Sequence, residues 1–582
     1  MKKNIYHTNY CKDLDISKIN KIVTVSGWIE NIRDHGGVLF LDLRDNTETL
    51  QIVSNDDSDF RGLSKESVIR VTGIIRKRNE ETYNPKIRTG EVELLVKKLD
   101  VLSKSKNDLP FEIISSKSIK EDVRLKYRYL DMRNQRVKNN ILLRSEILHY
   151  LRNKMYNLGF TEVQTPILTA SSPEGARDFV VPSRLFKGKF YALPQAPQIY
   201  KELLMVGGIE KYFQIAPCFR DEDARSDRTL EFYQLDLEMS YVEEDEILEI
   251  GEKIFYDTFS KFSKKKVSPM PFRRISYRDS MEKYGTDKPD LRNPLIIEDA
   301  TEILKDTSFG PFKKSIIKVI VVNDIGINSN SWFNEIVDYA TSIGMPGIGY
   351  VTLMENGTFK GPIDKFLTDT ERKLLIENYH MKKDSVMFFI ASRTKEIAEH
   401  QAGLIRIELG KKCKLIDEEK LELCIIKDFP MFEYDNKTKK YEFCHNPFSL
   451  PIGGIDVYET KKIDDILAHQ FDFVCNGNEM ASGALRNYDL KSLVKGFEIV
   501  GYKEDAVKER FKSIFTAFQY GCPPHGGMAP GIDRIIMLIQ DEPNLREVQA
   551  FPTSSSGQDF MMGSPSKLSN KQLKELGIEI SE

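Results

Sequence analysis

A run of mixed charge between two alternating segments places the strongest constraint on the fold of this chain. Residues 219–228 have the sequence FRDEDARSDR, and apolar residues alternate with polar ones in the flanking segments 212–216 and 232–239. This alternation predicts two antiparallel strands joined by a long charged loop. Three arginines with interleaved carboxylates suit a polyphosphate and its metal ions, because guanidinium groups pair with phosphate oxygens and carboxylates bind Mg2+. A solvated loop held by its own salt bridges explains this stretch alone about equally well.

A second stretch, residues 525–534, favours the phosphate interpretation. It has the sequence HGGMAPGIDR and is followed by the apolar run IIMLI, which predicts a buried helix with Arg534 at its start. Glycines let a backbone approach a ligand closely, and an arginine at a helix N-terminus is well placed to bind a phosphate.

Together the two stretches resemble motifs 2 and 3 of the class II aminoacyl-tRNA synthetases. Three further segments, SPEGARD (172–178), YALPQAPQ (191–198) and GTDKPDLR (285–292), make nearly the whole chain similar to the bacterial-type aspartyl-tRNA synthetases. The resemblance implies a multidomain α+β protein with an N-terminal five-stranded OB-fold β-barrel, a class II catalytic domain built on an antiparallel sheet, and an inserted α/β domain of the GAD type. It implies a ligase that activates L-aspartate with ATP and transfers it to the 3′ end of tRNA-Asp.

The composition limits the class of protein. A chain of 582 residues is too long for one hydrophobic core, so several domains are expected. The formal net charge is only -3, so a nucleic acid must be bound by local basic faces. Seven cysteines without a C-x-x-C pair argue against a disulfide framework or a zinc site. No apolar run approaches the ~18 residues of a membrane helix and no signal segment is visible at the start, so we expect a cytoplasmic protein without a membrane partner.

Five short strands are expected in the first hundred residues, at positions 22–29, 38–43, 50–53, 68–75 and 91–102. Their number and size are typical of an OB-fold barrel. Residues 268–415 contain alternating strand and helix signals but no catalytic constellation. The domain limits that we expect are 1–105 for the barrel, 106–136 for a linker or hinge, 137–285 for the first part of the catalytic domain, 286–415 for the inserted domain, 416–556 for the second catalytic part, and 557–582 for a C-terminal extension.

The barrel carries the residues expected to contact the anticodon. Phe40 lies in a strand near Arg33, and Gln51 lies in the next strand. A lone aromatic in a small barrel is more often a core residue, but the resemblance implies that a base stacks on Phe40 and that Gln51 reads its edge. His35 resembles the residue of relaxed members that also charge tRNA-Asn, whereas Glu81 stands where those members often have glycine. Two alternatives therefore stay open: the protein charges tRNA-Asp alone, or it charges both tRNA-Asp and tRNA-Asn.

A helix is expected from Val137, because apolar residues recur at helical spacing up to Leu158 and Gly159 can end it. A strand and a proline follow, and this unit resembles motif 1. The resemblance implies a homodimer, although an amphipathic helix that packs on its own domain fits the pattern equally well.

The implied reaction needs no general base from the protein. In the first step the aspartate carboxylate, already ionised at neutral pH, attacks the α-phosphorus of ATP. Catalysis then depends on positioning and on stabilising charge. The resemblance assigns the catalytic roles to Arg220 at the α-phosphate and Arg534 at the γ-phosphate.

The same resemblance implies the remaining ATP and metal residues. Thr229 stands where the family commonly has glutamine, and the segment after Glu479 has fewer glycines than usual. Without the motifs, Glu479 and Asp472 would be ordinary acids at strand ends. The implied ATP-binding residues are Arg220, Glu222, Arg228, Thr229, Glu479, Gly531, Asp533 and Arg534, and the implied Mg2+ ligands are Glu479 and Asp472.

The aspartate side chain is a carboxylate and requires cations, for which the resemblance implies Lys201 and Arg486. The α-ammonium group requires acceptors. A family histidine that closes on the substrate corresponds to His445, and the second histidine often found in the family is Asn446 here. The implied aspartate-binding residues are Glu174, Gln198, Lys201, Arg220, Asp236, His445 and Arg486.

Two alternatives compete with this interpretation. An asparaginyl- or lysyl-tRNA synthetase is disfavoured by the whole-length similarity, the insertion and the pair Lys201 and Arg486. A catalytically inactive relative that only binds RNA is disfavoured because Arg220, Glu479 and Arg534 are all present.

Overall fold

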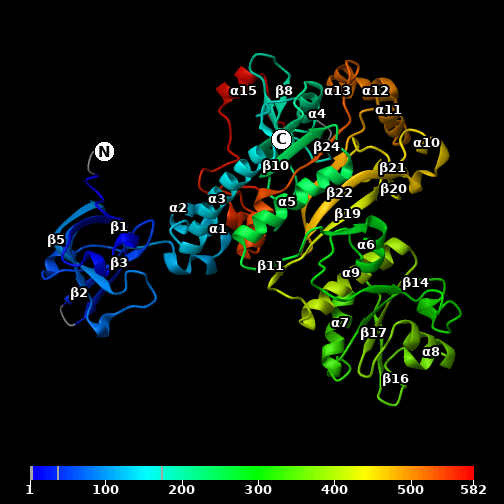
Figure 1. Ribbon diagram of the computed structural model, residues 1–582, viewed down its shortest axis with the longest axis horizontal. Coiled ribbons are helices and arrows are strands. Elements are labelled where there is room, and N and C mark those ends of the chain that lie inside the picture. The colour runs from blue at the N-terminus through cyan, green and yellow to red at the C-terminus, as the bar shows by residue number, and fades with distance from the viewer. Residues whose placement is uncertain (1–3, 36–37, 172–174, 582) are drawn as a thin grey trace. The chain divides into compact units, whose positions relative to one another are not determined.

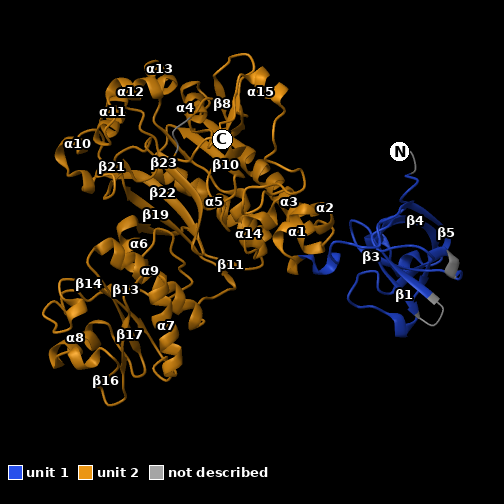
Figure 2. Ribbon diagram, turned by 180° about the vertical axis from the view of Figure 1, so that it is seen from behind, with its two compact units in different colours: residues 1–116 blue, residues 117–582 orange. Residues whose placement is uncertain are grey.

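The computed structural model describes residues 4–35, 38–171 and 175–581 of the chain. The chain divides into two compact units, residues 1–116 and 117–582, which Figure 2 shows in different colours. In the described residues, no helix is both long and apolar enough to cross a membrane.

The first unit contains a closed barrel with the strand order β1-β2-β3-β5-β4 (Figure 1). The strands are β1 (Ile22–His35), β2 (Val38–Arg44), β3 (Thr49–Val53), β4 (Val68–Lys77) and β5 (Val92–Ser103). Alternate side chains such as Val25, Leu41 and Ile52 fill its interior. The predicted five-stranded OB-fold is confirmed. Strand β1 is longer than expected because its first half pairs with β4 and its second half with β2.

The second unit is built on an eight-stranded, mostly antiparallel sheet with the order β12-β19-β22-β23-β24-β10-β9-β6. Its strands are β6 (Thr161–Glu162), β9 (Lys211–Phe219), β10 (Glu231–Ser240), β12 (Arg273–Ser276), β19 (Leu423–Pro430), β22 (Leu467–Cys475), β23 (Asn478–Leu485) and β24 (His525–Met528). Strands β9 and β10 are antiparallel and flank the charged loop, as predicted.

Three helices pack on this sheet through one hydrophobic core. They are α3 (Gln135–Asn157), α5 (Glu244–Phe262) and α14 (Ile532–Gln540), all seen in Figure 2. Leu151, Phe255 and Ile535 from the helices meet Leu237 and Phe473 from the strands. Helix α14 begins after Gly531, so Arg534 lies in its first turn, as the sequence predicts.

The second half of the segment expected as a linker is helical in the structure. Residues 117–136 form α1 (Glu121–Lys126), α2 (Arg128–Asp131) and the start of α3, all within the second unit. Arg124 is buried between Asp131 at 3.0 Å and Glu547 at 2.7 Å. Half of the residues 117–136 are charged and several form buried ion pairs, which is why the sequence resembles a polar linker.

Between α6 (Tyr277–Tyr284) and β19, the chain forms a smaller five-stranded sheet with its own helices. The strand order is β13-β14-β17-β15-β16, and neighbouring residues Phe388 and Phe389 of β17 point into two different cores. The elements are β13 (Ile297–Asp299), β14 (Ile316–Val322), β15 (Gly349–Leu353), β16 (Phe359–Lys360), β17 (Val386–Ser392), α7 (Asn330–Ser342), α8 (Asp369–Asn378) and α9 (Lys395–Lys412).

Shorter elements complete the second unit. They are β7 (Val180–Pro182), β8 (Phe190–Ala192), α4 (Gln198–Val206), β11 (Lys266–Val267), β18 (Lys420–Leu421), β20 (Phe432–Asp435), β21 (Lys440–Phe443), α10 (Val457–Thr460), α11 (Leu490–Ile499), α12 (Glu504–Arg510), α13 (Lys512–Phe518) and α15 (Asn570–Leu576).

Candidate active site

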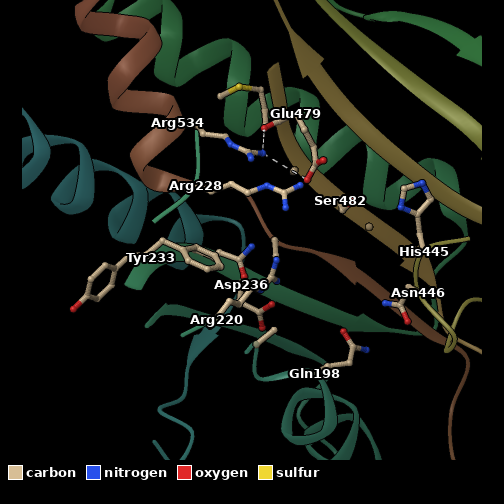
Figure 3. Close-up of a pocket in the computed structure, with 18 of the residues that line it drawn as sticks. Gln198, Arg220, Arg228, Tyr233, Asp236, His445, Asn446, Glu479, Ser482 and Arg534 are labelled. Carbon is tan, nitrogen blue, oxygen red and sulfur yellow. Dashed lines mark hydrogen bonds and ion pairs between the residues drawn. The ribbon is translucent and has the colours of Figure 1, made fainter. Parts of the chain in front are cut away.

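A cavity of about 400 Å3 opens over the middle of the large sheet. Strand β10, the loop that follows β9, the β22–β23 pair, α4 and the start of α14 all contribute side chains to it (Figure 3). Most of the residues implied for ATP and aspartate therefore meet in one place, although they come from segments far apart in the sequence. Asp472 is not one of the lining residues, and Glu174 lies outside the described residues.

Three arginines bring positive charge to the cavity, Arg228 and Arg534 near Glu479 and Arg220 near Asp236 (Figure 3). Arg228 pairs with Glu222 at 3.2 Å, and the Nη1 of Arg534 donates to the backbone carbonyl of Glu479 at 2.6 Å (Figure 3). The Nε of Arg220 is buried without a hydrogen-bond partner among the described residues. A buried donor of this kind costs free energy unless a ligand accepts from it, so Arg220 indicates an anion site.

Three other residues implied for ATP line the cavity but already have partners. The Thr229 hydroxyl donates to the carbonyl of Glu231 at 2.8 Å. Asp533 forms an ion pair with Arg144 of α3, and Gly531 precedes the first turn of α14. These contacts fix the wall of the cavity, so any role toward ATP is added to a structural one.

Two carboxylates from neighbouring strands form an acid pair, Asp472 on β22 and Glu479 on β23. Asp472 is 1% exposed, accepts from the Ser482 hydroxyl, and its Oδ2 has no partner among the described residues. Burial, reinforced by the charge of Glu479, raises the pKa of Asp472 to about 8.

The acid pair suits one type of metal site. No group of three or more histidine, cysteine or acidic residues that could hold a metal is present in the described parts of the chain. Mg2+ commonly takes one or two carboxylates and completes its shell with substrate phosphates and water. Two carboxylates beside three arginines fit that pattern, and the unpartnered Oδ2 of Asp472 is an available ligand atom.

Four buried charges form one network, and three of them, Lys201, Asp236 and Arg486, line the cavity. Lys201, Asp236, Glu238 and Arg486 are each at most 2% exposed. The Nζ of Lys201 lies 2.8 Å from Asp236 and 3.3 Å from Glu238, and the Nε of Arg486 lies 2.8 Å from Glu238. Burial raises the pKa of Asp236. Burial also opposes ionisation of Glu238, but Arg486 and Lys201 together lower its pKa.

Three polar side chains surround this network. Gln198 lines the cavity and donates to Glu202 at 2.6 Å. The ring of His445 packs edge-on against Phe429 and also lines the cavity. Burial, followed by the charge of Lys288, lowers the pKa of His445, and Asn446 lies beside it at the cavity wall.

Sequence reasoning missed several residues of the site. Gln234 and Glu238 share a face of β10 with Asp236, and polar residues two apart in a buried strand were the signal available. His525 lies 3.4 Å from Glu202, and although burial lowers its pKa, Cys522 and Glu202 raise it to about 10. Such pairings between distant segments leave no pattern in the sequence.

In the first unit, one barrel face brings together most of the residues implied for the anticodon. Phe40 lies opposite Arg33 in the β1–β2 register. The Nη2 of Arg33 donates to Asp42 at 2.6 Å and to Gln51 at 3.4 Å, and Gln51 donates to Glu93 at 2.7 Å. Glu81 lies in the connection between β4 and β5, and His35 is the last residue of β1.

Comparison with known proteins decides the family. The family described as class II tRNA synthetases (D, K and N) matches residues 120–555, and the OB-fold nucleic acid binding domain matches residues 23–102. The chain is 48% identical over 601 aligned residues to the aspartate–tRNA(Asp/Asn) ligase of Wolbachia pipientis wMel, with 100% of each chain covered. The chain belongs to the class II aspartyl-tRNA synthetases.

Solved structures share this fold at low sequence identity. An aspartyl-tRNA synthetase from Leishmania major Friedlin has a TM-score of 0.59 and 18% identity, with 95% of each chain covered. The asparaginyl-tRNA synthetase of Pyrococcus horikoshii, solved with asparaginyl-adenylate, has a TM-score of 0.58 and 18% identity over 95% of this chain and 98% of that one. The OB-fold and the synthetase domain expected from the sequence are confirmed by the two family matches.

Proposed function

We propose that this aminoacyl-tRNA ligase joins L-aspartate to tRNA through an aspartyl-adenylate formed in the cavity described above. The observation that carries the proposal is the division of charge within that one cavity. Arg228, Arg534 and Glu479 lie together at one end (Figure 3), and the buried network with two cations lies around Asp236 at the other. ATP suits the first end and the two charged groups of aspartate suit the second.

In the first step, the protein's part is to position the substrates and stabilise charge. The α-carboxylate of aspartate attacks the α-phosphorus of ATP in line with the departing pyrophosphate. Arg220, with its unpaired Nε, stabilises the charge that develops on the α-phosphate, and Arg534 holds the γ-phosphate from the first turn of α14. Glu222 and Arg228 complete the nucleotide end, with Glu222 on the adenine side.

Glu479 and Asp472 are the residues that would hold Mg2+. Bound there, the ion would neutralise part of the phosphate charge. Asp472 supplies an unpartnered buried oxygen and Glu479 lies at the cavity wall.

Selection of aspartate depends on the buried network. Lys201 and Arg486 face the side-chain carboxylate, while Asp236, Gln198 and Glu174 accept from the α-ammonium group. His445 closes on the substrate from the opposite wall. With aspartate bound, its α-ammonium group joins the cations Lys201 and Arg486, and its side-chain carboxylate joins Asp236 and Glu238. Three positive charges then face three negative ones, whereas asparagine would leave one cation unmatched.

Replacing Arg220 with alanine tests the catalytic assignment. If this side chain stabilises charge that develops in the transition state, Arg220→Ala should lower turnover in ATP–pyrophosphate exchange by ~10²–10³. Arg225→Ala, an exposed arginine of the same loop that does not line the cavity, is the matched control and should stay near wild type. Near-normal exchange by Arg220→Ala would remove Arg220 from the mechanism.

We also propose a homodimer, supported by an apolar surface on the β7–β8 hairpin. Leu185, Phe186 and Phe190 are 71%, 58% and 52% exposed, and Ile167 and Leu168 are also exposed. A patch of large apolar side chains on a soluble unit is typical of a protein interface. Sedimentation should give twice the mass of the chain, and Phe186→Glu with Phe190→Glu should give monomers. A wild-type monomer at micromolar concentration would contradict the proposal.

The tRNA is expected to be read by the barrel and aminoacylated at the large sheet, in the cytoplasm. The polar face with Arg33, Phe40 and Gln51 suits a stacked base whose edge is read by hydrogen bonds. The Wolbachia relative is named for both tRNA-Asp and tRNA-Asn, which favours relaxed specificity. The two anticodons differ at one base, and a specific base contact contributes ~1–3 kcal/mol in duplex readout.

Charging of purified tRNA transcripts tests this division of labour. The wild-type protein should aspartylate tRNA-Asp and tRNA-Asn, and His35→Leu should narrow it to tRNA-Asp while leaving ATP–pyrophosphate exchange unchanged. Absence of aspartyl-tRNA-Asn with the wild type would exclude relaxed specificity. A loss of exchange in the His35 variant would mean that the barrel contributes to adenylate formation.

A further inference from the structure

The segment of residues 285–292, which leads from α6 into the inserted sheet, approaches the acid pair of the cavity. The Nζ of Lys288 lies 3.4 Å from the Oε2 of Glu479 and 2.6 Å from Asp287. Glu479 lines the cavity, whereas Lys288 is not among the lining residues. Lys288 can therefore influence the cavity through the carboxylate of Glu479, and its charge also acts on Asp472.

The same segment packs against the turn that carries the acid pair. Gly477, at φ 80°, lies in the turn between β22 and β23, the strands of Asp472 and Glu479. A Cβ at Gly477 would lie 3.5 Å from the Cβ of Asp290 and 3.8 Å from the carbonyl oxygen of Lys288. The backbone at Lys288 thus runs next to the turn that carries the two carboxylates, in addition to the ion pair of its side chain.

Helix α9 of the inserted domain holds the other side of this segment. Arg406 is fully buried, and its guanidinium donates to the carbonyl oxygens of Leu295 at 2.6 Å, Asn293 at 2.6 Å and Asp290 at 3.0 Å. Three carbonyl contacts from one rigid guanidinium define the path of the chain between residues 290 and 295.

Two glycines let α9 approach this closely. A Cβ on Gly285 would lie 2.5 Å from the Cα of Gly403, and a Cβ on Gly403 would lie 2.6 Å from the carbonyl oxygen of Gly285. The backbones of α9 and of the segment are therefore in direct contact. A displacement of the inserted domain would move Lys288 with it.

We propose that Lys288 is a positioning residue through which the inserted domain sets the metal affinity of the acid pair. Lys288 supplies an internal positive charge to Glu479 and Asp472, and a divalent cation at these carboxylates must bind against that charge. Arg406 holds Lys288 in place from α9. The inference rests on the proposed function only in taking Asp472 and Glu479 as the metal-binding acids.

The physical reason is the repulsion between like charges at close range. Lys288 and a metal ion on Glu479 would lie within a few ångströms of each other in a partly buried site, where solvent screens their repulsion incompletely. Removing the lysine charge should therefore strengthen metal binding by ~10-fold, a factor that a single nearby charge can account for.

The direct test measures the binding of Mn2+ alone to the full-length protein. Electron paramagnetic resonance detects the bound ion, and no ATP is present. Lys288→Met should bind Mn2+ ~10-fold more tightly than wild type, and Lys288→Arg should bind like wild type. Lys383→Met, an exposed lysine of the inserted domain paired with Glu355, is the matched control and should change nothing. Equal affinity of wild type and Lys288→Met, or no Mn2+ binding by either, would overturn the proposal.

A second pair of variants tests the part played by the inserted domain. Arg406→Met should change Mn2+ affinity in the wild-type background and have no further effect in the Lys288→Met background, because both act through one charge. If Arg406→Met does not fold, Gly410→Ala serves, since its methyl group would lie 2.3 Å from the Nδ2 of Asn293 and displace the same segment. Additive effects would mean that Arg406 does not act through Lys288.

Failure of this inference can be told apart from failure of the proposed function. Glu479→Gln should weaken Mn2+ binding if Glu479 is a metal ligand. An unchanged affinity in Glu479→Gln would remove the metal assignment itself, and the inference with it. Weakened binding in Glu479→Gln together with no effect of Lys288→Met would leave the assignment intact and overturn only the role of Lys288.

Discussion

The buried network of Lys201, Asp236, Glu238 and Arg486 is the constraint on which the rest of the catalytic unit depends. Four charges that are almost fully removed from water are tolerable only if each is paired, because removing one partner of a buried pair costs ~3–5 kcal/mol. The pairing requires α4, β10 and the end of β23 to meet at one point. The arrangement of the sheet is therefore coupled to the chemistry of the pocket.

Gly527 shows how closely the backbone must approach for this network to form. A Cβ there would lie 2.1 Å from the carbonyl oxygen of Leu237 and 2.3 Å from the Oε2 of Glu238. The Nη2 of Arg486 donates to the Gly527 carbonyl oxygen at 3.3 Å. The glycines that precede the helix of motif 3 thus allow β24 to lie against β10, in addition to leaving space for a nucleotide.

The sequence predicted the parts of the protein that are encoded locally. The alternation around the charged loop predicted β9 and β10, and the apolar run after Gly531 predicted α14 with Arg534 in its first turn. Nearly all the residues that the family motifs imply for ATP and aspartate line one cavity. The helices at residues 117–136 were missed, because their charged residues find partners far away in the sequence, such as Glu547 for Arg124, more than 400 residues distant. Glu238, His525 and Lys288 were missed for the same reason, since each acquires its role from a partner on another strand or domain.

We propose that the buried network selects aspartate by its side-chain carboxylate, and the ratio of aspartate to asparagine activation measures this selection. In ATP–pyrophosphate exchange the wild type should prefer aspartate by hundreds of times, as expected from ~3–5 kcal/mol for one unmatched buried charge. Arg486→Leu should erase most of this preference. The double variant Arg486→Leu with Glu238→Gln should do the same, and it also removes the carboxylate that would otherwise lose its arginine partner. Lys491→Leu, an exposed residue at the start of α11, serves as the control. A variant without Arg486 that still prefers aspartate as strongly as wild type would contradict the account.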